Sequence, residues 1–147
     1  MNKEFIMRGQ TGSGLTEVLN FSGNTPGYAY RLTEFKVYPS AAIGTGGGEL
    51  VGSITAGKTA VAPTDPNFNN EGLIGTAILF ISAGNTGPYI DSVINDTFLI
   101  TQDLILMVQN TGGSGQPVNW QCRFVAEKLV NGEEALANYK QFTISND

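Results

Sequence analysis

The sequence has no histidine, a single cysteine at Cys122, and few charged residues, which make up only 14% of its 147 positions. Without histidine, the chain cannot form a Ser-His-Asp or Cys-His catalytic arrangement. One cysteine cannot close a disulfide within the chain or supply a thiolate cluster for zinc. The eight lysines and arginines are scattered, so the basic patch that marks a nucleic-acid partner is missing. We therefore predict no cofactor and no nucleic-acid partner.

Long apolar stretches are also missing. No segment reaches the roughly 20 apolar residues that a membrane-spanning helix needs. Residues 1–14, MNKEFIMRGQTGSG, contain an apolar run of only three residues, which is shorter than the core of a signal peptide. We therefore expect no membrane partner and synthesis in the cytoplasm.

Glycine, by contrast, is abundant. The 19 glycines are nearly twice the usual share of about 7%. The length of the chain and its hydrophobic content of 41% suit one globular domain over residues 1–147. Clusters of turn formers such as SGNTPG and AGNTGP separate short apolar segments, which indicates an all-β protein.

The clearest predicted strand covers residues 118–128, VNWQCRFVAEK. Apolar and polar residues alternate along it with a period of two, as in a half-buried strand. The face that we expect to be buried carries Val118, Trp120, Cys122, Phe124 and Ala126. Cys122 lies between two aromatic residues of this face, so we interpret it as a small core residue with a neutral thiol.

A second long strand is predicted over residues 97–110, TFLITQDLILMVQN. Phe98, Ile100, Leu104, Leu106 and Val108 share one parity. The connection 111–117, TGGSGQP, is rich in turn formers. We therefore predict that residues 97–110 and 118–128 form a long antiparallel hairpin whose buried faces meet in the core.

The remaining predicted elements complete an all-β fold. Residues 72–84, GLIGTAILFISAG, are apolar on both parities, which indicates a strand covered on both sides. Weaker strand signals lie at 16–21, 28–38, 49–55 and 89–94. Asn131 and Glu134 resemble a capping box and predict a short helix, although Asn131-Gly132 also suits a hairpin turn. We predict an antiparallel β-sandwich, jelly-roll-like, with one short C-terminal helix.

Residues 52–59, GSITAGKT, match the G-x-x-x-x-G-K-[ST] pattern of a phosphate-binding loop. Such a loop needs a buried strand before it and a helix after it. Pro63 and Pro66 follow the pattern, and a proline inside a helix costs about 3 kcal/mol. We therefore predict a strand and a turn here, with no bound nucleotide. The glycines of residues 43–50, IGTGGGEL, likewise lack the spacing of a dinucleotide fingerprint.

Three other groups of side chains are candidates for a site. Asp65, Asn67, Asn69 and Glu71 alternate oxygen ligands like the start of a calcium loop, but its glycine and its final acidic residue are missing. A carboxylate pair could hydrolyse glycosides, and the best candidates are Asp91, Asp96 and Asp103. The aromatic residues that could line a sugar site are Tyr28, Tyr30, Tyr38 and Trp120. None of these groups completes a known arrangement, so we predict a protein without enzymatic activity and without metal-binding residues.

Residues 95–130, NDTFLITQDLILMVQNTGGSGQPVNWQCRFVAEKLV, resemble the C-terminal halves of small auxiliary capsid proteins of marine tailed bacteriophages. The shared pattern is an Asp-rich turn, a strand of the type ITQDL, a Gly/Ser loop and a final long strand. Residues 132–142, GEEALANYKQF, are similar to the acidic-then-basic segment of the same group. The resemblance covers the last third of the chain and implies a β-sandwich or jelly-roll module.

The resemblance implies a capsid decoration or cement protein, which binds the outside of a phage head and has the major capsid protein as its partner. The apolar residues on both parities of 72–84 and 97–110 exceed the need of one small core, so we expect a homo-oligomer, which the resemblance implies to be a trimer. The candidate contact loops are 44–48, 62–72 and 111–117. The alternatives are a carbohydrate-binding β-sandwich module and another virion component, such as a fibre or tail protein.

Overall fold

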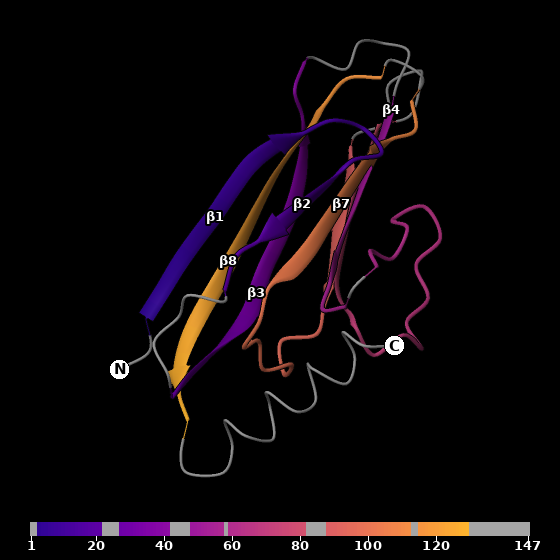
Figure 1. Cartoon of the computed structure of the whole chain (residues 1–147). Coiled ribbons are helices and arrows are strands. Elements are labelled where there is room, and N and C mark those ends of the chain that lie inside the picture. The colour runs from indigo at the N-terminus through magenta and orange to yellow at the C-terminus, as the bar shows by residue number, and fades with distance from the viewer. Residues whose placement is uncertain are drawn as a thin grey trace.

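The computed structural model describes residues 3–21, 27–41, 48–57, 59–81, 88–112 and 115–129. Within these ranges the protein is an all-β sandwich of two antiparallel sheets (Figure 1). Its strands are β1 (Lys3–Thr11), β2 (Thr16–Leu19), β3 (Tyr28–Pro39), β4 (Gly48–Thr55), β5 (Leu73–Ile81), β6 (Tyr89–Ile94), β7 (Leu104–Asn110) and β8 (Val118–Lys128). Among the described residues there is no helix that is long and apolar enough to span a membrane.

The two sheets differ in size. The three-stranded sheet has the order β1-β8-β3, and the five-stranded sheet has the order β2-β7-β4-β5-β6. The all-β sandwich predicted from the sequence is thus confirmed. The predicted C-terminal helix, with Asn131 and Glu134 at its start, lies outside the described residues.

The core lies between the sheets and contains the residues predicted for it. Trp120, Cys122 and Phe124 of β8 are buried, because β8 is the central strand of its sheet and turns this parity inward. From the other sheet, β7 contributes Leu104, Leu106 and Val108, which lie on one face of the strand and are fully buried. Burial raises the pKa of the Cys122 thiol, which keeps the thiol neutral, as predicted from its place in the strand.

The predicted hairpin of residues 97–110 and 118–128 is wrong. β7 lies between β2 and β4, whereas β8 lies between β1 and β3 in the opposite sheet. Alternation only requires that one face of each strand be covered, and strands in opposite sheets meet that requirement as well as strands in a hairpin. The connection 111–117 therefore joins a strand of one sheet to a strand of the other.

The segment before β7 also departs from the prediction. The predicted strand begins at residue 97, whereas β7 begins at Leu104. Ile100 is buried and forms a single antiparallel bridge with Tyr30 of β3, with N–O distances of 2.8 and 2.9 Å. Asp103 ends this segment by accepting a hydrogen bond from the backbone N–H of Phe21, at 2.6 Å. Phe98 and Ile100 are therefore buried in a segment that links the two sheets, which explains the strand-like apolar pattern of residues 97–103.

Arg31 of β3 strengthens the same cross-link. Its guanidinium forms an ion pair with Glu127 of β8 and donates hydrogen bonds to the backbone carbonyls of Asp96 and Thr97, at 3.3 and 3.0 Å. The hydrogen bond from Arg31 holds the pKa of Glu127 below its usual value. The guanidinium thus ties the three-stranded sheet to the connection between β6 and β7.

β1 is absent from the predicted strands. Phe5, Met7 and Gly9 share one parity, and the other parity carries Glu4, Arg8 and Gln10 together with the exposed Ile6, so the alternation that would identify the strand is interrupted at Ile6. It pairs with β8 along its whole length, from Lys3 opposite Ala126 to Thr11 opposite Val118.

Glycines within the strands let large side chains of the three-stranded sheet approach the opposite backbone. A Cβ atom at Gly52 would lie 2.8 Å from Cζ of Phe35, and one at Gly75 would lie 2.8 Å from Cδ2 of Leu32. Both neighbours are fully buried and have little room to move. Gly52 and Gly75 therefore act as sockets for β3, although glycine is a poor residue for a strand in general.

Substitution of Gly52 by alanine is expected to lower the free energy of unfolding by about 1–3 kcal/mol, because the new methyl group overpacks the core against Phe35. Urea denaturation measures the change. In the background of Phe35→Leu, which shortens the opposing side chain, the same substitution should cost clearly less. Equal costs in both backgrounds would contradict the socket.

Candidate interaction surface

The connection between β4 and β5, residues 56–72, folds back over the outer face of the five-stranded sheet. Ser53 of β4 donates a hydrogen bond from its hydroxyl to the carbonyl of Val61, at 2.6 Å, and the N–H of Val61 donates to the hydroxyl of Thr55, at 3.1 Å. Pro63 of this connection is buried. β4 is therefore covered on both faces, and its buried hydroxyls are hydrogen-bonded to the connection.

This arrangement accounts for GSITAGKT. Residues Gly52 to Thr55 belong to β4, a central strand that pairs with β5 on one side and with β7 on the other. Gly52 pairs with Ala77 of β5 on one side and with Val108 of β7 on the other. Its backbone is therefore part of the sheet, whereas the backbone of a phosphate-binding loop must be open to the ligand. The predicted strand is confirmed, and Lys58 lies outside the described residues.

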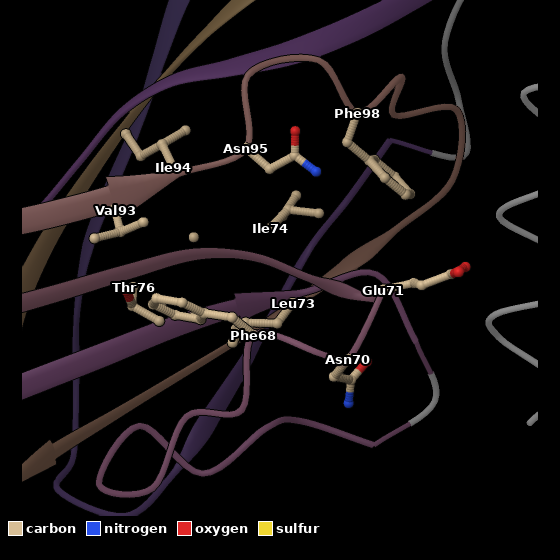
Figure 2. Close-up of a pocket in the computed structure, with 11 residues that line it drawn as sticks. Phe68, Asn70, Glu71, Leu73, Ile74, Thr76, Val93, Ile94, Asn95 and Phe98 are labelled. Carbon is tan, nitrogen blue, oxygen red and sulfur yellow. The ribbon is translucent and has the colours of Figure 1, made fainter.

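A cleft of about 370 Å³ separates this connection from the end of the sheet (Figure 2). Phe68 from the connection forms one wall and leaves 65% of its surface exposed. The floor and the other walls come from β5, β6 and the segment that follows β6, and consist of Leu73, Ile74, Gly75, Thr76, Val93, Ile94, Asn95 and Phe98. Asn70 and Glu71 also line the cleft, so its lining combines apolar side chains with amide and carboxylate groups.

The amide oxygens around this cleft hold turns in place. Oδ1 of Asn70 accepts a hydrogen bond from the N–H of Gly72, at 2.9 Å, and Oδ1 of Asn95 accepts from the N–H of Thr97, at 3.2 Å. In the calcium-like stretch, Oδ1 of Asn67 accepts from the N–H of Asn69, at 3.0 Å. Among the described residues, no group of three or more acidic, histidine or cysteine side chains is placed to hold a metal ion. The oxygens of this stretch therefore have a turn-forming role.

The three candidate carboxylates make separate local contacts. Asp91 lies exposed on β6 and accepts hydrogen bonds from the hydroxyl of Tyr89, at 3.1 Å, and from the N–H of Ser92, at 2.8 Å. The hydrogen bond to Asp91 and the charge of its carboxylate raise the pKa of Tyr89. Asp103 accepts from the backbone of Phe21, and Asp96 lies in the connection held by Arg31. Each contact supports local structure.

The candidate aromatic residues divide between the interior and the surface. Tyr30 packs against the rings of Phe5 and Phe21, with centroids 5.4 and 5.2 Å apart. Trp120 is buried, and its indole N–H donates to the hydroxyl of Thr11, at 2.9 Å. Tyr28 and Tyr38 are exposed. Of the four, Tyr38 and Trp120 share a depression of about 690 Å³ that reaches Ile90 of β6.

Exposed apolar side chains gather instead on β6 and beside it. β6 is an edge strand, and the exposed fractions of Tyr89, Ile90 and Val93 are 56%, 56% and 52%. The adjacent β5 adds Phe80, which pairs with Tyr89. Phe68 lies close by, since both it and Val93 line the cleft of Figure 2. Ile90 has the opposite parity and faces the depression beside Trp120, so we call Phe68, Phe80, Tyr89 and Val93 the β6 surface.

The expected surplus of apolar residues on 72–84 and 97–110 is smaller than their sequence indicates. Ile78 of β5 and Ile105 and Met107 of β7 are half-buried, and Ile74 is fully buried under the β4–β5 connection. The sequence signal that identifies the β6 surface is YIDSVI, residues 89–94, a strand with three large apolar residues among its first five and no basic residue.

No family model matches this chain, and no curated protein or solved structure is significantly similar to it. The geometry of the β6 surface and of the cleft beside it is thus the main structural guide to function.

ATP with magnesium is expected to leave the melting temperature of the protein unchanged, because the backbone of β4 is already paired on both sides. Differential scanning fluorimetry with and without the nucleotide measures this, with Lys58→Ala as the control. An ATP-dependent rise in melting temperature that Lys58→Ala removes would show that the stretch binds phosphate.

Proposed function

We propose that this chain is a capsid decoration protein, a non-catalytic module that binds the outside of a phage head and ties neighbouring capsid subunits together. The observation that carries the proposal is the β6 surface, where exposed large apolar side chains gather on one edge of a β-sandwich. Isolated apolar side chains are common on protein surfaces, but grouped ones usually mark a partner. The resemblance of residues 95–130 to auxiliary capsid proteins indicates which partner this is.

The mechanism is mass action. A protein that binds the assembled shell, but not its separated subunits, stabilises the shell by the free energy of that binding. The β4–β5 connection is suited to such a contact, because it presents Phe68 outward while Ser53 and Thr55 hold its base to the sheet. The partner in this proposal is the major capsid protein, and the place of action is the outer surface of the virion.

Capsids that lack this protein are expected to gain added density on their lattice when mixed with it and imaged by cryo-electron microscopy. The double variant Phe68→Ser, Val93→Ser should bind at least about tenfold more weakly, because a buried side chain of this size contributes about 1.5–3 kcal/mol. Val18→Ser is the matched control, because Val18 is an exposed valine on β2, the opposite edge of the same sheet. Bare shells at saturating wild-type protein would refute the proposal.

A second candidate function is carbohydrate binding. The cleft of Figure 2 is lined by the exposed Phe68 and also by Asn70, Glu71 and Asn95. A flat apolar ring next to amide and carboxylate groups is the combination that a sugar ring with its hydroxyls requires.

If this second function is the correct one, the protein should bind members of a glycan panel, and Phe68→Ala should abolish the signal whereas Phe68→Trp should retain it. Binding is measured by calorimetry with the glycans that score on the panel, and Val18→Ser again serves as the control. A panel without any binder would exclude this function and would leave the capsid proposal unaffected.

A further inference from the structure

The four edge strands of the two sheets differ in how they are protected against pairing with another chain. Exposed edges are usually blunted by charges, by proline, by a bulge or by short length. β2 has only four residues. β3 has a bulge between Leu32 and Glu34 and ends at Pro39, and β1 carries charges at Lys3 and Arg8. β6 has six residues in regular register with β5 and contains no lysine, arginine or proline.

The hydrogen bonds between β5 and β6 fix which backbone groups of β6 point away from the sheet. The N–H of Asn95 donates to the carbonyl of Ile74, at 2.8 Å, so these two residues form a hydrogen-bonded antiparallel pair. Such pairs alternate along an antiparallel ladder. The β6 residues whose backbone groups point outward are therefore Ile90, Ser92 and Ile94.

The central outward donor is engaged by a side chain. The N–H of Ser92 donates to Oδ1 of Asp91, at 2.8 Å, which agrees with its pointing away from β5. Oδ2 of Asp91 accepts from the hydroxyl of Tyr89. Asp91 thus covers one donor of an edge that no other strand of the described residues pairs with.

We propose that a second copy of this chain adds its β6 antiparallel to this edge, in the register that places Ser92 opposite Ser92 of the partner subunit. A two-fold axis perpendicular to the sheet then relates the two copies. It keeps corresponding faces of the two sheets on the same side and aligns the outward backbone groups of the two β6 strands. The inference does not depend on the proposed capsid function, and it gives a two-fold pair rather than the trimer that the resemblance implies.

Charge selects this register. Only two registers pair most of β6 and also align the outward groups. One of them places Asp91 directly opposite Asp91 of the partner subunit in a non-hydrogen-bonded pair, where Cα atoms approach to about 4.5 Å and like charges are destabilising. The proposed register instead places Asp91 opposite the partner's Val93, and Ile90 opposite the partner's Ile94. Exposed apolar surface is then covered and the carboxylates are kept apart.

The pair is expected to be weak and dependent on concentration. A standard stable interface uses about 20–30 residues a side, whereas this edge offers the six residues of β6 and the neighbouring Phe80. Pairing also requires Asp91 to release the N–H of Ser92. Removal of the Asp91 carboxylate should therefore tighten the association.

Ser92→Cys tests the register directly. The Cα atoms of a hydrogen-bonded antiparallel pair are about 5.5 Å apart, within the range of a disulfide, whereas in the other register the two positions are diagonal neighbours about 7–8 Å apart. Mild oxidation is expected to yield a covalent dimer of Ser92→Cys. Val18→Cys, at the exposed edge strand β2, should remain monomeric. Cys122 is buried and does not interfere.

Sedimentation velocity over a range of concentrations tests the strength. Asp91→Ala should lower the dissociation constant of the dimer by up to about tenfold, the equivalent of one hydrogen bond. Ser92→Pro removes an N–H that is not part of the ladder with β5 and should abolish the dimer, whereas Ser92→Ala should not. Melting temperatures establish that each variant is folded. The proposal is overturned by the absence of a Ser92→Cys dimer, by a trimer that Ser92→Pro leaves intact, or by an unchanged mass for Asp91→Ala.

Discussion

The sandwich depends on the fit of β3 into glycine sockets on β4 and β5. Two sheets about 10 Å apart cannot both contribute a large side chain at every inner position, and here Phe35 and Leu32 lie against Gly52 and Gly75. This fit places β3 against β4 and β5, and β3 also contacts β6. Ile90 of β6 has the parity of the buried residues of β5 and lines the depression that it shares with Tyr38 and Trp120. β6 thus has one face toward the three-stranded sheet and its other face, with Tyr89 and Val93, toward the outside.

The sequence predicts where the strands lie better than it predicts which strands pair with each other. Strand signals in the sequence located β4, β6 and β8 to within a residue or two, and in β8 the signal was a period of two in the residue types, which one-sided burial leaves. The same pattern could not distinguish a hairpin from two strands in facing sheets, so the pairing of residues 97–110 with 118–128 was wrong. Burial without strand structure, as at Ile100, also mimics a strand.

The surface was less accessible to prediction than the core. Whether YIDSVI is exposed depends on which strand ends the sheet, and that is a property of the whole topology rather than of six residues. The cleft depends on the β4–β5 connection folding back through Ser53, Thr55 and Val61, and nothing in the spacing of these residues indicates such contacts. Asp65 and Asp91 were singled out from the sequence as candidate site residues, but the hydrogen bonds that Asp91 accepts could be found only in three dimensions.

The pairing of β1 with β8 determines the order in which the protein can fold. Lys3 lies opposite Ala126, so the first strand of the three-stranded sheet has no partner until almost the entire described chain has been synthesised. The β4–β5–β6 meander, by contrast, has its partners nearby in sequence and can form while translation continues. Contacts between distant segments slow folding, because a long loop must close before they form. β1 therefore has no β8 to pair with until Val118–Lys128 has been synthesised, and completion of the three-stranded sheet is a late step of folding.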